Sequence, residues 1–358
     1  MKKTSTTFKV ILALLFACFN LAAMAQTPTD GDYRSAVASG NWGNAATWQV
    51  RTAGNWAAAV SAPTSANNVY IQTGHVITVN VATADARDLH ANTTGNLIIG
   101  ANTLTVSGKL RAYTGTAVTT AGADGTFYSG QTSSTSPGAN SITSTGAGKL
   151  SVIGNSRTLF NTGEWGATTT GFAMEINLTA GQSVLCQQSS KAASWNVISG
   201  TLNAAATTVS ADNGTTGGDI TIAAGATISS DRTGAQWVFQ RTGTTVGATL
   251  TVNGTLRLGG TNPTIAMATI ILNGTVNLAR AGAQSINVTI PSGAATMNTF
   301  NNLVLSGSGV KTLATTGITV NGKMTLQDAT FSVATFSITY GASATLEYSG
   351  AALQTANT

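Results

Sequence analysis

The chain has 358 residues, with 17 basic and 12 acidic ones, and charged residues make up 8% of the total, about a third of the usual share. So few charges exclude a highly charged disordered tail, and the basic residues are scattered singly, which argues against a nucleic-acid-binding stripe. Val, Ile, Leu and Thr are frequent and no helix-length run of Leu, Glu, Lys and Ala occurs, which predicts β-strands throughout.

Residues 1–25 have the three parts of a secretory signal peptide. Two lysines follow Met1, an apolar run covers 10–19, and Ala23 and Ala25 fit the small-residue positions before a cleavage site. The alternatives are an N-terminal membrane anchor, for which the run is short, and a lipoprotein signal at Cys18. We therefore expect a secreted protein.

Cleavage after residue 25 would remove three lysines and leave 14 basic residues against 12 acidic ones. Cys186 would be the remaining cysteine, so we expect neither an intrachain disulfide nor a cysteine-rich metal site. No later segment has the roughly 18 unbroken apolar residues of a membrane span, so we expect no transmembrane segment after signal cleavage.

A nine-residue pattern recurs along the rest of the chain: apolar, any, apolar, Asn or Ser, Gly, Thr or Lys, apolar, any, apolar. Alternating apolar positions on both sides of the glycine predict strands with one buried face. Asn-Gly predicts a corner, because both residues tolerate positive φ. The copies are 104–112, 196–204 (the loosest), 250–258, 270–278 and 318–326.

Two architectures share this pattern, because Asn-Gly can close an antiparallel hairpin or bend one coil of a parallel β-solenoid. The interval from Gly254 to Gly274 is 20 residues, close to one coil and longer than the hairpin repeat of a sandwich. Intervals of 48 residues from Gly274 to Gly322 and of 54 from Gly200 to Gly254 would then be two coils or more. The predicted fold is an all-β, right-handed parallel β-helix with an aromatic-rich N-terminal capping module; antiparallel β-sandwich repeats are the alternative.

Short motifs near the N-terminus carry a family resemblance. They resemble the opening module of large repeat-bearing surface proteins of the type IX secretion kind, and their Trp, Pro and Gly-x-Val spacing is similar to the G8 domain. They are 39–42, 46–48, 62–64, 68–71 and 74–79.

Residues 301–313 with 318–326 are similar to the β-helical repeats of the same proteins. The resemblance implies export through secretion machinery and an outer cell-surface or extracellular location. With the sequence pattern, it suggests three parts: a signal peptide (1–25), a cap or G8-like module (26–95) and β-solenoid repeats (96–358), which look truncated because repeat material continues to the C-terminus.

The function expected is an extracellular structural scaffold or adhesin-like surface protein that is not an enzyme, with no cofactor, metal or catalytic residue. The segment Asp85 to His90 gathers two carboxylates, an arginine and an imidazole, but we expect a polar turn there, and His75 as an edge residue of a strand. The alternative function is a polysaccharide-binding module, because exposed aromatic rings stack on sugars. Its candidate contacts are Trp42, Trp48, Trp56 and Tyr70.

A carbohydrate-active enzyme is a third and less favoured hypothesis, since hydrolysis needs two converging carboxylates and the 12 acids are dispersed. The partners expected are an extracellular polysaccharide or a host or matrix surface, and not nucleic acid.

Overall fold

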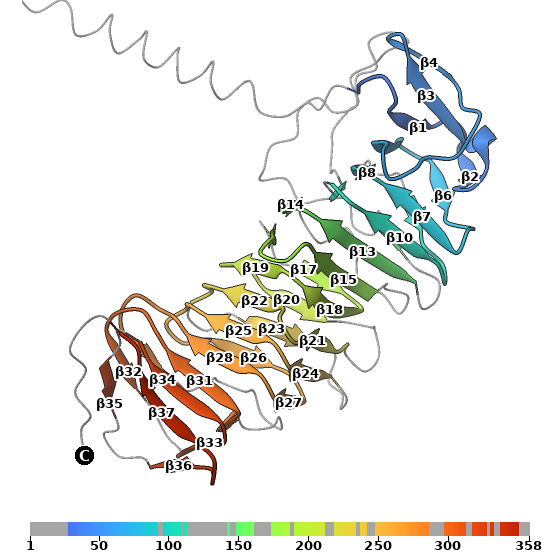
Figure 1. The fold of residues 1–358 in the computed structure, drawn as a ribbon. Coiled ribbons are helices and arrows are strands. Elements are labelled where there is room, and N and C mark those ends of the chain that lie inside the picture. Colours follow the sequence, from blue (N-terminus) through green and yellow to red (C-terminus); the bar gives the residue numbers. More distant parts are fainter. Residues whose placement is uncertain are drawn as a thin grey trace, which may run out of the picture.

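The structure is a computed structural model in which the chain forms one elongated stack of β-strands (Figure 1). It describes residues 28–91, 96–108, 110–112, 142–143, 148–160, 173–186, 190–211, 218–233, 237–241, 248–285, 297–312, 317–327, 330–332 and 337–350. The predicted signal peptide, 1–25, lies outside the described residues.

One sheet, called sheet A, runs the whole length of the stack and has fifteen strands. They are β1 (Tyr33–Ser35), β3 (Trp48–Thr52), β4 (Asn55–Ala58), β5 (Val69–Ile71), β8 (Leu89–Ala91), β11 (Leu110–Ala112), β14 (Arg157–Phe160), β16 (Ser183–Cys186), β19 (Thr201–Ala205), β22 (Thr227–Ser230), β25 (Thr255–Leu258), β28 (Thr275–Leu278), β31 (Asn302–Leu305), β34 (Lys323–Leu326) and β37 (Thr345–Tyr348).

Five shorter sheets form the other faces. Sheet B contains β2 (Ser39–Asn41), β6 (Val76–Thr78), β9 (Asn96–Ile98) and β12 (Ile142–Thr143); sheet C contains β7 (Thr83–Ala86), β10 (Thr103–Val106), β13 (Lys149–Gly154), β15 (Ala173–Leu178), β18 (Ser194–Ser199), β21 (Ile220–Ile222), β24 (Thr249–Val252) and β27 (Thr269–Leu272). Sheet D contains β17 (Ser190–Ala192), β20 (Val209–Ala211), β23 (Trp237–Arg241) and β26 (Thr264–Ala266); sheet E contains β29 (Gln284–Ser285), β32 (Val310–Thr312) and β35 (Thr330–Ser332); sheet F contains β30 (Thr299–Phe300), β33 (Ile318–Val320) and β36 (Ile338–Tyr340).

The chain visits three faces in turn and then returns to the first. From β19 it passes from sheet A to sheet D, then to sheet C, and back to sheet A at β22. Each returning strand pairs in parallel with the equivalent strand of the previous round, and among the described strands only β1 with β3 and β3 with β4 pair antiparallel. This all-β arrangement of parallel sheets is compatible with a β-solenoid, and the described strands do not form antiparallel sandwich repeats.

Strand pairing places the sequence repeats in register. Leu256 pairs with Val276, and Thr249 to Val252 pair with Thr269 to Leu272, so the 20-residue interval is one coil. Val276 pairs with Leu303 and Leu303 with Met324, which confirms that the 48-residue interval spans two coils. The loosest copy contains a register shift: Val197 pairs with Ile176 but Ser199 pairs with Asn177.

The core is a set of apolar rows that run along the stack axis. The row of sheet A that begins at Val184 continues through Leu202, Ile228, Leu256, Val276, Leu303 and Met324, and each of these side chains is buried. Burial of one such side chain stabilises the fold by roughly 1.5 to 3 kcal/mol relative to exposure. The alternating apolar positions of the sequence are therefore the interior of the stack.

The Asn-Gly corners differ from the expectation. Gly254, Gly274 and Gly322 do not adopt the left-handed backbone conformation. They lie against the backbone of the previous coil, so that a Cβ on Gly274 would lie 2.1 Å from the Gly254 carbonyl oxygen. The asparagines form part of a ladder, in which Asn273 Nδ2 donates to Asn253 Oδ1 at 2.9 Å. The close approach of the previous coil, not a positive φ, therefore explains why these positions are glycine.

The N-terminal end of the stack differs from the coils. A 3-10 helix, η1 (Ala45–Thr47), leads into the antiparallel hairpin β3–β4, which extends sheet A beyond β1. Parallel pairing already begins with β1 to β5 and β2 to β6, so stacked strands occur within residues 26–95 as well as after them.

Candidate functional site

Two of the predicted sugar contacts form the interior of the N-terminal end. Trp42 and Trp48 are each 1% exposed, and their ring centroids lie 5.1 Å apart in an edge-to-face arrangement. Trp48 Nε1 donates to the Trp42 carbonyl oxygen at 2.8 Å. Neither ring offers a face to a sugar in this structure.

Tyr70 is also buried, within the outward row of sheet A. Its ring stacks on His90 of the next strand, with centroids 4.7 Å apart, and its hydroxyl donates to Asp32 Oδ2 at 3.3 Å. Burial raises the pKa of Asp32, an effect that hydrogen bonds from Thr29 and Tyr70 oppose. These groups hold β1, β5 and β8 together and present no exposed ring.

Trp56, the fourth predicted contact, is the one that keeps partial exposure. The Arg34 guanidinium carbon lies 4.6 Å from its ring centroid and that of Arg51 lies 6.0 Å away. Such cation–π contacts contribute about 0.5 to 1 kcal/mol at exposed sites. Part of the ring surface is therefore already used by arginine.

The segment from Asp85 to His90 turns a corner instead of forming one strand. Asp85 lies in β7 of sheet C, whereas His90 lies in β8 of sheet A. Asp88 precedes β8, and its carboxylate packs against Gly108. A Cβ on Gly108 would lie only 1.9 Å from Asp88 Oδ1. The segment therefore belongs to the turn between two faces, with its acids and its imidazole on different elements.

Ser35 and His75 form a pair that the sequence did not indicate, because 40 residues separate them. Ser35 Oγ lies 2.8 Å from His75 Nδ1 and accepts a hydrogen bond from the Gln72 backbone N–H at 2.9 Å. Burial, with the charge of Arg34, lowers the pKa of His75. Because Ser35 is fully buried, this pair ties β1 to the turn before β6.

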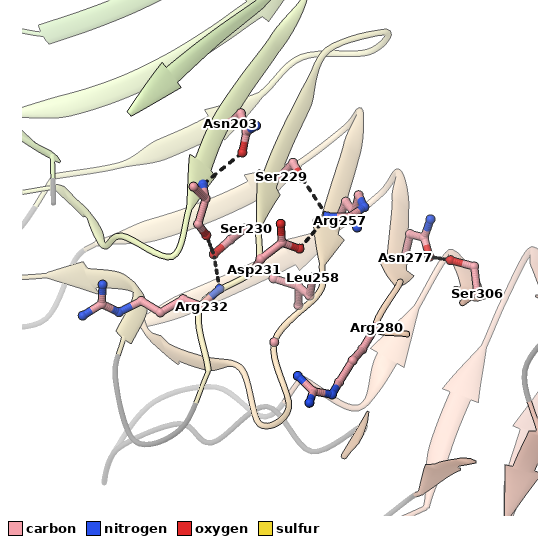
Figure 2. A network of polar contacts seen from close by, with 12 residues as sticks. Asn203, Ser229, Ser230, Asp231, Arg232, Arg257, Leu258, Asn277, Arg280 and Ser306 are labelled. Atoms are coloured by element: carbon pink, nitrogen blue, oxygen red, sulfur yellow. Dashed lines mark hydrogen bonds and ion pairs between the residues drawn. The ribbon is translucent and has the colours of Figure 1, made fainter. Parts of the chain in front are cut away.

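The outward face of sheet A carries two polar rows along consecutive coils. One row is a threonine ladder, in which Thr201, Thr227, Thr255 and Thr275 are paired neighbours. The second row contains Asn203, Ser229, Arg257 and Asn277 (Figure 2).

Side chains of the second row bind one another across coils. Arg257 Nη1 donates to Ser229 Oγ at 3.0 Å and to Asp231 Oδ1 at 2.8 Å. Ser306 Oγ donates to Asn277 Oδ1 at 2.7 Å. The face is thus a regular, mostly uncharged polar surface, and Arg257 supplies its central charge.

Two arginines that are far apart in the sequence are aligned beside this face, two coils apart. Arg232 follows β22 by two residues and Arg280 follows β28 by two, and Ser230 of β22 is aligned with Leu278 of β28 through Leu258. The scattered basic residues therefore include an aligned pair. The sequence held a sign of this alignment, because Arg232 and Arg280 are 48 residues apart, the same as the two-coil interval between Gly274 and Gly322.

Over the described ranges, no three His, Cys, Asp or Glu side chains gather closely enough to hold a metal ion. Within the same part of the chain, no helix has the length and apolar character needed to cross a membrane. No family model, curated protein or solved structure matches this chain.

Proposed function

We propose that this protein is an extracellular structural scaffold with an adhesin-like role at the outer cell surface, and that it acts without catalysis. The observation that carries the proposal is the continuous fifteen-stranded sheet A, whose inward rows stay apolar and in register from coil to coil. A stack of this kind transmits load along its axis through backbone hydrogen bonds and presents long, regular faces to a partner.

The sequence motifs add detail to this proposal about the fold, the N-terminal module and the export route. The chain would be a right-handed β-helix with an N-terminal module of the G8 kind, made with a cleaved signal peptide and exported by a type IX route. The buried pair Trp42 and Trp48 supports a capping role for this module, because an aromatic core under a terminal hairpin covers the first coil.

The aromatic side chains of the N-terminal module are poorly placed to bind a polysaccharide. Trp42, Trp48 and Tyr70 are buried, and Trp56 is packed against Arg34. A polysaccharide-binding role would therefore need a different surface.

The proposal is tested by deleting the protein from its native cells and restoring it. We expect surface protease treatment to remove the protein from intact cells, and the deletion to weaken adhesion to neighbouring cells or matrix. Restoration with Leu256→Asp, which disrupts the core, should fail, whereas Thr255→Ser, a neighbouring outward change, should succeed. A protein found only inside the cell, or adhesion unchanged by the deletion, would overturn the proposal.

A further inference from the structure

Three successive turns place Arg232, Gly260 and Arg280 at equivalent positions. Each lies two residues after one of the aligned residues Ser230, Leu258 and Leu278. The turns touch, because a Cβ on Gly260 would lie 1.7 Å from the Arg232 carbonyl oxygen. Strands in a sheet lie about 4.8 Å apart, so the two arginines are roughly 10 Å apart along the stack, and glycine puts no side chain between them.

The two arginine side chains lean the same way, toward the preceding coil (Figure 2). Arg232 Nη1 donates to the Ala206 carbonyl oxygen of that coil at 2.6 Å, which fixes its direction. Arg280 Nε lies 3.7 Å from the position that a Cβ on Gly282 would take, so this side chain stays close to its own turn. The backbones of the two arginines therefore repeat along the axis, two coils apart.

Positive charge is in excess at this corner. The carboxylate beside it, Asp231, is bound by Arg257, and among the described residues no carboxylate lies within ion-pair distance of Arg232 or Arg280. Lys311 is fully buried and its Nζ donates to the Arg280 carbonyl oxygen, so it is not part of the exposed corner.

Ion pairs with carboxylates are found elsewhere in the described part of the chain. Arg51, Lys149 and Lys323 each have a carboxylate within 4.0 Å. In a chain with 8% charged residues, two aligned arginines without a carboxylate in ion-pair distance among the described residues are a feature that an anionic partner would complete.

We propose that the corner formed by Arg232, Gly260 and Arg280 binds an acidic polysaccharide through its carboxylate or sulfate groups. The planar fork of a guanidinium matches both anions with paired hydrogen bonds. A polymer suits the corner because the two cations repeat along the stack axis, and the Asn203 to Asn277 row beside them offers amide and hydroxyl groups to sugar hydroxyls. The proposal goes beyond the scaffold role and does not depend on it.

Other anionic polymers fit less well. Duplex DNA carries one charge per ~1.7 Å of its axis and needs many phosphate contacts for useful affinity, whereas this corner has two cations roughly 10 Å apart. A membrane surface would require apolar side chains beside the basic ones, and the neighbouring outward row is polar.

The test measures binding of the purified protein to polygalacturonate, to dextran sulfate and to uncharged dextran. We expect binding to the two acidic polymers that weakens with salt, and none to dextran. The double variant Arg232→Gln, Arg280→Gln should lose about tenfold in affinity. A matched double variant, Lys149→Gln with Lys323→Gln, changes the net charge equally at distant sites and should lose less than about twofold.

Asp231→Asn should strengthen binding, because it removes a negative charge beside Arg232 that repels the anion and frees Arg257 from its ion pair. Thermal unfolding of every variant confirms that the fold is kept. Equal losses in both double variants, weaker binding by Asp231→Asn, no binding to either acidic polymer, or tighter binding to DNA or to anionic vesicles would each overturn the proposal.

Discussion

The two ends of the stack differ in how their last strands are covered. At the N-terminal end, the β3–β4 hairpin extends sheet A and Trp48 is 1% exposed. At the C-terminal end, β37 continues the register, because Met324 pairs with Leu346 and Leu326 with Tyr348, yet Leu346 and Tyr348 are each 44% exposed.

The difference shows what produces burial in this fold. Leu303 and Leu346 occupy the same row of sheet A, two coils apart, but Leu303 is fully buried. A coil therefore buries its side chains through the coils on both sides of it, and burial follows position in the stack more than residue identity. Stability should then be a sum over neighbouring coils, with the end contributions set by caps.

The largest effect should come from removing the aromatic core of the covered end. Trp48→Ala deletes a buried ring together with its contact to Trp42, and we expect unfolding to require about 3 to 5 kcal/mol less free energy. The matched change Trp56→Ala removes a half-buried ring of the same hairpin and should cost about 1 kcal/mol. Urea unfolding followed by circular dichroism measures both, and equal losses would contradict the capping role of Trp48.

A matched pair of leucines tests the role of neighbouring coils directly. Leu303→Ala should cost about 3 kcal/mol because both adjacent coils pack on the side chain, whereas Leu346→Ala in the same row should cost less than about 1 kcal/mol. The measurement is again the free energy of unfolding in urea. Similar values for the two variants would mean that Leu346 is covered in solution.

The sequence predicted the strands, the parallel register and the inward rows, since these follow from period-2 alternation and from a repeat such as 250–258 with 270–278. It did not predict why the corner glycines are required, because the carbonyl that Gly274 approaches belongs to the previous coil. Contacts between coils of unequal length were also hidden. Ser35 contacts His75 only after the chain has completed a turn of the stack, and Arg232 and Arg280 become aligned only after two turns.

Alanine substitutions of two corner glycines test the difference between inner and end coils. Gly274→Ala places a methyl group against a backbone carbonyl of the previous coil, with another coil on its other side, and should cost about 2 to 3 kcal/mol. Gly341→Ala meets its nearest atom, Asn321 Cα, at 3.0 Å in the last described coil, which can shift outward, so the cost should be under about 1 kcal/mol. Thermal unfolding ranks the two, and a larger loss for Gly341→Ala would contradict this explanation.

Two lysines of neighbouring coils should respond differently to pH. Lys323 is half-exposed and lies 3.3 Å from Glu347 of β37, whereas Lys311 is buried and donates to the carbonyl oxygens of Arg280 and Gly282. Burial, with the charge of Arg280, lowers the pKa of Lys311 to about 8. Above that pH the folded protein keeps a neutral amine, whose two N–H groups still serve both carbonyls.

Between pH 8 and the usual lysine pKa of about 10.4, the unfolded chain binds a proton at Lys311 that the folded chain does not. Stability should therefore rise with pH across this window, by about 1 to 2 kcal/mol between pH 7 and 9.5. Lys311→Gln should abolish the rise, because an amide does not titrate in this range. The fold should be kept, since the amide can imitate Gln284, which donates to Leu258 and Gly260 one coil earlier. Urea unfolding at both pH values measures the effect relative to Lys323→Gln, which should retain the rise; a rise that persists in Lys311→Gln would assign it to another group.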